Sequence, residues 1–161
     1  MANVWILAVM MVATLVLSFG SFRIAAIVGS VGLLSIGLGM GALWLFGFPF
    51  GFTAIVGVMG LMGVAINDSI VVLAALQANP EVSSGDHEAV VKTVSVATRH
   101  IVSTSLTTMA GFAPLIIAGG GFWPPLAVAI AGGVCGATIL ALYFAPSAYL
   151  LLLCDGGHVS E

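Results

Sequence analysis

Long apolar runs constrain this chain more than any other feature of its sequence. A helix needs about 20 predominantly apolar residues to cross a hydrocarbon core about 30 Å thick. Inside hydrocarbon the backbone must satisfy its own hydrogen bonds, which favours helices. Five stretches approach or reach the required length, at about 4–22, 24–46, 52–77, 101–118 and 126–153. We therefore expect an all-α membrane protein, a single transmembrane domain over residues 1–161 built as a bundle of five transmembrane helices.

The composition supports this class and excludes others. Hydrophobic residues make up 61% of the chain and charged residues only 6%, whereas soluble domains are about 45–50% apolar and about 25% charged. The lipid bilayer is therefore the first expected partner. Three Lys and Arg residues in a chain of net charge −3 are too few for a nucleic-acid-binding surface. The sequence contains no catalytic or metal-ligand motif, so we expect no enzyme activity, no cofactor and no metal site.

The basic residues predict a topology because they occur in only two of the connections between spans. Arg23 lies in the first connection, and Lys92 and Arg99 lie in the third, over residues 78–100. Short loops that carry Lys and Arg stay in the cytoplasm. We therefore expect 78–100 to be a cytoplasmic connector, the N-terminus to lie outside and the C-terminus to lie in the cytoplasm. Arg23, Arg99 and Trp123 are the expected anchors at the membrane interfaces.

The third connection also contains a helical pattern of apolar residues. Ala89, Val90, Val94 and Ala97 would share one face of a helix over residues 86–98. This pattern predicts a short amphipathic helix lying at the membrane interface. A solvated loop is the alternative.

Small residues within the spans indicate how the helices pack. Without a hydrophobic driving force between helices in lipid, small residues let backbones approach closely. Their density favours a compact bundle. The glycines expected at helix contacts are Gly37, Gly41, Gly60, Gly63, Gly132 and Gly136.

Asp68 is the residue that points to a function. It lies near the middle of Ile55–Gln77, where the other charged or amide residues are its neighbour Asn67 and Gln77 itself. A carboxylate at the centre of a span costs about 2.5–3.5 kcal/mol on insertion scales, and such residues commonly carry protons or bind cations. The alternative is a neutral, hydrogen-bonded packing residue. Asn67 projects about 100° away around the helix, where it would bond to a neighbouring helix.

Hydroxyl groups supply the expected polar partner for Asp68. Ser and Thr residues are concentrated in the first half of the fourth span, and Thr104 and Ser105 are the best placed to form a polar seam with Asp68. The alternative is that each hydroxyl bonds a carbonyl of its own helix. The predicted proton relay is therefore Asp68, Asn67, Thr104 and Ser105. An ionisable group that faced hydrocarbon would have no compensation, so we expect Asp68 to face the fourth span and to be buried in the bundle. No Lys or Arg lies near mid-span, so we expect its carboxyl to be largely protonated at neutral pH.

An ordered set of motifs resembles the C-terminal half of resistance–nodulation–division (RND) efflux transporters. The glycine, polar pair and Ile/Val run of Gly63–Val72 resemble the motif of the fourth and tenth helices in that family. Further motifs resemble the flanking helices, and the match covers nearly the whole chain. They are Ser21-Phe22-Arg23, Arg99–Ser105, Gly111–Leu115, Gly132-Gly133 and Phe144-Ala145-Pro146.

The resemblance implies that the chain corresponds to helices eight to twelve of a larger transporter. In this family a large periplasmic porter domain precedes these helices, and the complete pump is a proton-driven antiporter of the bacterial inner membrane. The implied partners are the N-terminal half, the porter domains, a homotrimer and a periplasmic adaptor. One departure matters. The drug-efflux branch commonly has a Lys–Asn pair where this chain has Asn67-Asp68, which makes Asp68 the candidate proton carrier here.

Two functions follow from these observations. The first is a transmembrane segment of a proton-coupled RND-type efflux transporter, a fragment of a larger protein whose substrate is chosen in porter domains outside this chain. The alternative is a structural or assembly membrane subunit that does not transport, or a degenerate remnant. The chain carries half of the expected relay, which favours the alternative for this polypeptide in isolation.

Overall fold

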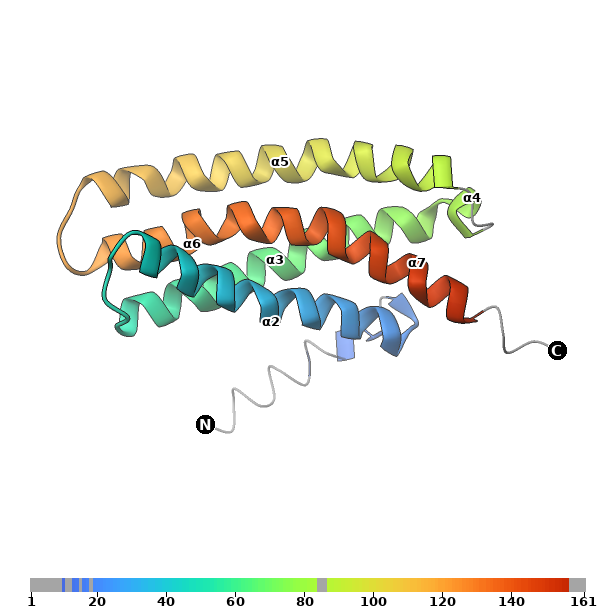
Figure 1. The fold of residues 1–161 in the computed structure, drawn as a ribbon, viewed down its shortest axis with the longest axis horizontal. Helices are drawn as coiled ribbons and strands as arrows, with labels where there is room; N and C mark the ends of the chain where they lie inside the picture. The colour runs from blue at the N-terminus through green and yellow to red at the C-terminus, as the bar shows by residue number, and fades with distance from the viewer. Residues whose placement is uncertain (1–9, 11–12, 15, 18, 84–86, 157–161) are drawn as a thin grey trace.

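The chain folds into a bundle of long helices (Figure 1). The computed structural model describes residues 10, 13–14, 16–17, 19–83 and 87–156. The helices are α2 (Phe22–Leu45), α3 (Phe52–Ala78), the one-turn α4 (Pro80–Ser83), α5 (His87–Ile117), α6 (Trp123–Ile139), the π-helical segment η1 (Leu140–Phe144) and α7 (Ala145–Gly156).

Four helical stretches within the described residues are long and apolar enough to cross a membrane. They are Phe22–Leu45, Phe52–Ala78, Glu88–Ile117 and Trp123–Leu152. The predicted class of an all-α membrane bundle is therefore confirmed. Most of the span predicted at about 4–22 lies outside the described residues.

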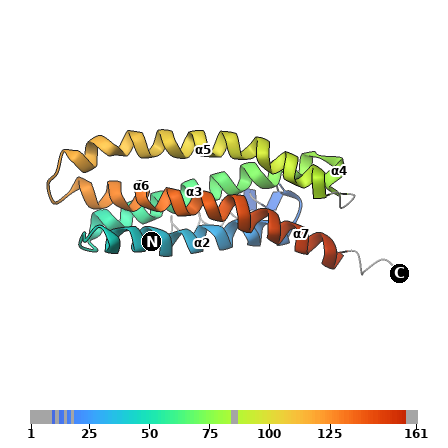
Figure 2. The same cartoon turned by 45° about the horizontal axis from the view of Figure 1, so that its top comes forward.

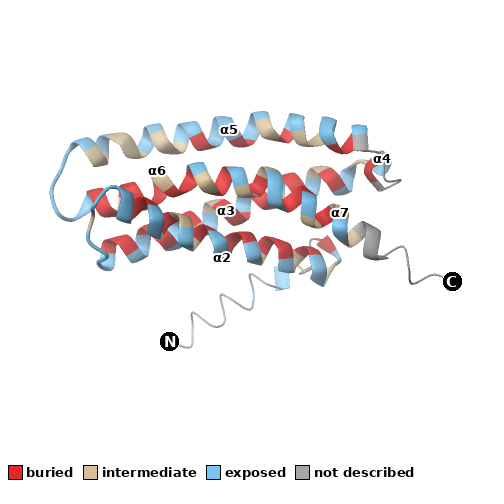
Figure 3. Ribbon diagram, viewed as in Figure 1, coloured by how far each residue is buried: buried red, intermediate tan, exposed pale blue. Residues whose placement is uncertain are grey.

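The helix α6 is the centre of the bundle. It packs against α2, α3 and α5, and Figures 1 and 2 show α5 and α2 on opposite sides of it. In an apolar 18-residue window of Trp123–Leu152, 56% of the residues are buried, whereas in the corresponding window of Glu88–Ile117 only 11% are buried. Figure 3 shows this contrast as buried colour along α6 and mostly exposed colour along α5. One side of α5 therefore contacts the bundle while most of its surface faces outward.

The bundle has two distinct ends. The connections Phe46–Gly51 and Ala118–Phe122 lie together at one end, which we call the loop end (Figure 1). The opposite end, the α4 end, holds α4 and the beginnings of α2 and α5. Both loop-end connections include glycines with positive φ, +70° at Gly47 and +70° at Gly119, a conformation that other residues adopt only with strain.

The predicted amphipathic helix at the interface is not confirmed as a separate element. Its residues form the first turns of α5, because no Pro or Gly interrupts the helix between Glu88 and Ile101. With 31 residues and a rise of about 1.5 Å each, α5 is about 46 Å long. That length exceeds a hydrocarbon core of about 30 Å. The first turns of α5 can therefore extend beyond the core instead of lying flat upon it.

The apolar face predicted for this segment does exist. Ala89, Val90 and Ala97 are each 5% exposed, and Val94 packs against the same buried cluster. This face contacts protein, so the beginning of α5 is attached to the rest of the bundle. Asn79 ties it further, because its side-chain amide donates a hydrogen bond to Oγ1 of Thr93 over 3.0 Å.

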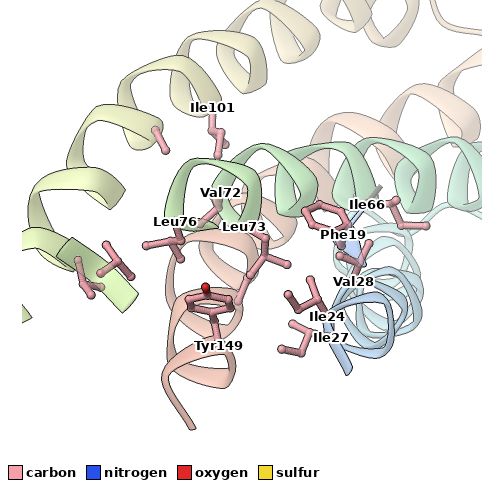
Figure 4. Packing of buried hydrophobic residues seen from close by; sticks show 14 of the residues in the cluster. Phe19, Ile24, Ile27, Val28, Ile66, Val72, Leu73, Leu76, Ile101 and Tyr149 are labelled. Atoms are coloured by element: carbon pink, nitrogen blue, oxygen red, sulfur yellow. The ribbon is translucent and has the colours of Figure 1, made fainter. Parts of the chain in front are cut away.

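Large apolar side chains fill the bundle toward the α4 end (Figure 4). They come from α2, α3, α5 and α7, and Phe19 comes from the residues before α2. Transfer of each side chain out of water would stabilise the fold by roughly 1.5–3 kcal/mol, and transfer out of lipid stabilises it less. The labelled members of this cluster are Phe19, Ile24, Ile27, Val28, Ile66, Val72, Leu73, Leu76, Ile101 and Tyr149.

Glycines bring the helix backbones together toward the loop end. A Cβ added at Gly57 of α3 would lie 2.8 Å from the carbonyl oxygen of Leu126 in α6. One at Gly133 of α6 would collide with the side chain of Leu61 of α3, and one at Gly39 of α2 would meet the same leucine at 2.8 Å. The three central helices therefore approach one another where side chains are absent.

The glycines predicted for packing fall into two groups. Cβ atoms at Gly132 and Gly136 would meet Ala42 and Leu38 of α2 at 2.7 and 2.8 Å. A Cβ at Gly60 would make an ordinary contact with Ile130 at 3.4 Å. The remaining three have no neighbour within 4 Å among the described residues, because they lie on outward faces of α2 and α3: Gly37, Gly41 and Gly63.

A π-helical turn interrupts the last long helix. Pro146 has no backbone N–H, so the carbonyl of Leu142, four residues earlier, cannot receive the usual α-helical bond. The helix widens into η1 directly before this proline. Such π segments are rare and frequently occur at functional sites.

Candidate functional site

Asp68 is enclosed by the bundle at the middle of its length. It lies on the inner face of α3 and is 2% exposed. Its Oδ2 atom is buried and has no hydrogen-bond partner among the described residues. Its neighbour Ser69 is no such partner, because the Ser69 hydroxyl donates to the carbonyl oxygen of Ala65 over 2.8 Å. An isolated carboxylate in such a place is costly unless it is protonated or paired.

The packing of α3 against α6 identifies what lies beside Asp68. The two helices run in the same direction, and Leu61 of α3 contacts Gly133 of α6. One turn further, Ala65 and Ala137 belong to the same buried cluster. Continuing this register places Asp68 level with the last residues of α6 and the beginning of η1.

The packing of α3 against α5 places Asp68 at the same height along the bundle as Ser105. These helices run in opposite directions, and Val72 and Ile101 are members of the cluster in Figure 4. One turn from them toward the loop end lie Asp68 on α3 and Ser105 on α5. The predicted proximity of Asp68 to the fourth span is therefore supported by the register of the two helices.

A hydrogen bond between hydroxyl groups crosses the bundle at this level. The oxygens of Ser105 on α5 and Thr138 on α6 lie 2.5 Å apart, and both side chains are buried. Together with Asp68 they form a set that we call the polar layer. Sequence reasoning included Ser105 but missed Thr138, because a lone Thr in an apolar helix gives no signal of its own. Its position two residues before η1 is visible only in the fold.

Apolar side chains enclose the polar layer on its other sides. The helix α2 runs antiparallel to α3 and presents Val28 and Val31, both 0% exposed. Ala141 of η1 and Ala145 of α7 are equally buried. None of these groups titrates. Among the described residues, no Lys, Arg or His is buried, so none lies within the layer.

Two members of the predicted relay face away from this layer. Asn67 is exposed on the outer face of α3. Thr104 is exposed on α5, and its hydroxyl donates to the carbonyl oxygen of His100 over 3.0 Å. The structure therefore brings Ser105 to the level of Asp68 but does not bring Asn67 or Thr104 to the same side. Within this chain the predicted relay is divided between an inner and an outer surface.

The outer surface continues into a cleft toward the α4 end. The cleft has a volume of about 480 Å³ and lies between α3, α4 and α5. Val71 and His100, one turn beyond Asn67 and Thr104, line it together with Lys92. The cleft thus combines an apolar wall with polar and charged side chains, among them Lys92, His100 and the acidic Glu81.

Two of the predicted interface anchors, Arg23 and Trp123, lie at helix ends, whereas Arg99 lies within α5. Arg23 is exposed in the first turn of α2, and Arg99 is exposed on α5. Trp123 begins α6 at the loop end, and its ring lies edge-on to that of Phe122 with centroids 5.1 Å apart. All three side chains are free to reach a membrane interface.

The helical bundle and its exposed apolar surface define an integral membrane protein. The chain matches the AcrB/AcrD/AcrF family over residues 1–153. It belongs to this family, which is the RND transporter family that its motifs resemble. RND proteins are efflux transporters and not enzymes.

Individual relatives differ in what they are named for. The nickel-cobalt-cadmium resistance protein NccA of Alcaligenes xylosoxydans xylosoxydans is 32% identical over 142 residues, which cover 86% of this chain and 13% of that protein. The cobalt-zinc-cadmium resistance protein CzcA of Cupriavidus metallidurans is 34% identical over 116 residues, 70% of this chain and 11% of the relative.

A third relative is named for drugs instead of metals. The multidrug resistance protein MdtC of Escherichia coli is 34% identical over 113 residues, 68% of this chain and 11% of that protein. The matched segments therefore span only about an eighth of the length of these relatives.

Proposed function

We propose that this chain is a transmembrane segment of a proton-coupled RND antiporter and that Asp68 carries the proton. The observation that supports this function best is the burial of Asp68, whose Oδ2 has no partner among the described residues in the middle of a candidate span. A group in this position changes its charge when it binds or releases a proton. Such a change in charge alters the free energy of keeping the side chain buried by several kcal/mol. This difference is enough to favour one helix arrangement over another.

In the proposed cycle Asp68 receives a proton from the outer side of the membrane and releases it to the cytoplasm. Uptake makes the side chain neutral and lets the apolar walls close around it, whereas release requires contact with a polar path. The cleft lined by Lys92 and His100 is the candidate exit, because it begins one turn from the outer face of α3 at this level. Movement of α3 relative to α5 would connect the two.

The proposed orientation places the α4 end in the cytoplasm and the N-terminus outside. Arg23 and Lys92 both lie toward the α4 end, in the first turns of α2 and α5. The exposed rings of Trp44 and Trp123 lie toward the loop end. This distribution agrees with the tendency of basic residues to stay on the cytoplasmic side. A bacterial inner membrane is the proposed location.

The remaining parts of the pump are proposed from the family. They are the N-terminal half, the porter domains, a homotrimeric assembly and a periplasmic adaptor. The cargo is a metal cation, as the names of NccA and CzcA suggest, or an organic drug, as that of MdtC suggests. The porter domains would decide between these substrate classes.

The test of the proton carrier is the substitution Asp68→Asn in the complete gene product that includes this segment. Asn retains the size of the side chain and removes its titration, so insertion should be unchanged while export falls at least tenfold. Cells without RND pumps would be assayed for export of Ni²⁺, Co²⁺ and a fluorescent dye at matched expression. Ser35→Ala is the control, because Ser35 is buried but donates to the carbonyl of Gly32 in its own helix.

Full export by Asp68→Asn would refute the proton-carrier role and leave Asp68 as a packing residue. Asn67→Ala is expected to reduce export less, because Asn67 is exposed in this chain. The alternative function, a subunit or remnant without transport, predicts that the wild-type gene product exports none of the three probes. That result would reject the transport function itself.

A further inference from the structure

The Ser105–Thr138 pair differs from most hydroxyl groups in the spans. Hydroxyls such as those of Ser30, Ser69 and Thr108 donate to carbonyl oxygens of their own helices, over 2.8, 2.8 and 2.9 Å. That bond uses the only proton of the hydroxyl. Ser105 and Thr138 bond to each other instead, between two helices. Their hydrogen-bonding capacity is therefore not fully used within α5 and α6.

The number of protons in the pair has a chemical consequence. Two hydroxyls carry two protons, and one is enough to form the bond between their oxygens. Either oxygen can be the donor in this pair. The hydroxyl that accepts still holds a proton to give to a third atom. No second acceptor for it occurs among the hydrogen bonds of the described residues.

The matching acceptor lies in the same layer of the bundle. The register of α3 against α6, and of α3 against α5, places Asp68 level with both hydroxyls. Its Oδ2 is a buried acceptor without a partner. The other walls of the layer, among them Val31, Ala141 and Ala145, offer no polar side chain. The described bundle thus contains one free donor and one free acceptor at one level.

We propose that Thr138 is a positioning residue for Asp68, acting through its hydrogen bond to Ser105. The proposal rests on the function proposed above and adds Thr138, a residue of α6, to the residues that control the proton. In this proposal the pair presents its free hydroxyl proton to the carboxylate when the helices bring them into bonding distance, and that bond would stabilise the charged form, because a donated hydrogen bond favours the charged form of a carboxylate. Without Thr138, the Ser105 hydroxyl can turn back to a carbonyl of its own helix.

The position of η1 supports a role in a moving element. It begins two residues after Thr138, and its Ala141 is buried at the level of Asp68. A π-helical turn departs from the regular α-helical hydrogen-bond pattern and often marks a functional site. Rotation of α6 at this point would break the Ser105–Thr138 bond and change the donor available to Asp68. Thr138 is therefore placed to link helix movement with the protonation of Asp68.

The experiment compares two substitutions at Thr138 in the complete gene product. Thr138→Val preserves the shape of the side chain and removes the hydroxyl, whereas Thr138→Ser preserves the hydroxyl. Proton-driven export of Ni²⁺, Co²⁺ and a fluorescent dye is measured from pH 5.5 to 8.5 at matched expression. Thr138→Val should move the pH of half-maximal export upward by about half a unit or more, because the carboxylate loses a donor. Thr138→Ser should restore the wild-type profile.

The control and the other outcomes separate the two proposals. Ser35→Ala removes a buried hydroxyl that bonds within α2 and should leave the pH profile unchanged. If Thr138→Val lowers export equally at every pH, or has no effect, while Asp68→Asn abolishes export, Thr138 has only a packing role. If Asp68→Asn exports normally, the proposed proton carrier itself is wrong. A profile shifted equally by Thr138→Val and Thr138→Ser would also reject the role of the hydroxyl.

Discussion

At the scale of residues, a rotation of about 100° separates two very different environments. Asp68 and Asn67 are neighbours on α3, yet Asp68 is buried and Asn67 is exposed. The carboxyl group of Asp68, which costs more free energy to bury, is enclosed by this chain. The neutral amide of Asn67 lies on the surface. A carboxylate on the outer face would depend on another helix for any partner. The arrangement thus turns Asp68 toward the interior of this bundle, where Ser105 and Thr138 are also buried.

The glycine contacts give a prediction at the same scale. Gly57→Ala should destabilise the protein, because the new Cβ would lie 2.8 Å from the backbone oxygen of Leu126, which cannot rotate away. Overpacking of this kind costs about 1–3 kcal/mol. Gly41→Ala is the matched control, with nothing within 4 Å of its Cβ, and should stabilise α2 by about 0.5–1 kcal/mol through helix propensity. Thermal unfolding in detergent measures both, and equal melting temperatures for the two variants would contradict the described helix contact.

At the scale of elements, α5 combines a membrane span with an extension beyond it. Its inward residues pack on the bundle, while most of its Ser and Thr side chains face outward and bond to the carbonyls of α5 itself. These hydroxyls make the outward surface of α5 less apolar than the surface of a helix that faces only lipid. Such a surface fits contact with further protein in the complete transporter.

The span formed by α5 predicts the accessibility of the connections at its two ends, one from α3 and one to α6. Single cysteines at Ala78, which ends α3, and at Gly121, in the loop after α5, should be labelled from opposite sides of the membrane. The background would lack Cys135 and Cys154, and a membrane-impermeant maleimide applied to intact cells would reach only the Gly121 position. Labelling of both from outside would contradict the span over α5. Labelling of Ala78 alone would invert the proposed orientation.

At the scale of the whole molecule, aromatic and basic residues mark opposite ends of the bundle. Trp44 is 84% exposed and Trp123 is 54% exposed, both toward the loop end. Arg23 and Lys92 lie toward the other end. Trp at the headgroup level and Lys or Arg on the cytoplasmic side are the ordinary anchors of a membrane bundle. We expect this distribution to set how far the bundle sits into the bilayer.

This distribution predicts the depth of both tryptophans. In a Trp5→Phe background, lipids brominated near the headgroup should quench the fluorescence of Trp44 and Trp123 more strongly than lipids brominated near the chain ends. Phe substitutions at each position in turn would separate the two signals. Stronger quenching by the deeper label would show that the loop end is buried in hydrocarbon, in conflict with the interface anchors.

The sequence was sufficient for the broad features of the fold because the spans are long and apolar. The spans predicted at 24–46 and 52–77 agree closely with α2 and α3. The boundary of α5 was harder to predict, since charged residues such as Lys92 and Arg99 resemble a connection but do not break a helix. The direction in which each glycine faces was also hidden, because a glycine has no side chain to reveal periodicity. Gly37 and Gly41 were therefore expected at contacts, whereas Gly39 makes one.

The polar layer could be predicted only in part, for a physical reason. A carboxylate in an apolar run stands out in any sequence, so Asp68 was evident. Ser105 was one of several hydroxyls, and only tertiary packing decides which of them turns inward. Thr138 occurs in a helix of small and apolar residues, and its importance depends on the register between α5 and α6. Partners that are distant in sequence require the fold.

The helices pack through glycines at the loop end and through large side chains at the α4 end, and this difference affects how they can move. Toward the loop end, Gly39, Gly57 and Gly133 hold three backbones together at contact distance. Toward the α4 end, large side chains such as Leu73 and Tyr149 keep the helices apart (Figure 4). The close backbone contacts at the loop end restrict movement there, whereas side chains at the α4 end can change rotamer. The helices can therefore tilt most easily about the loop end. A tilt of a few degrees would displace the helices most at the α4 end and would change the space around Asp68, which lies between the two ends.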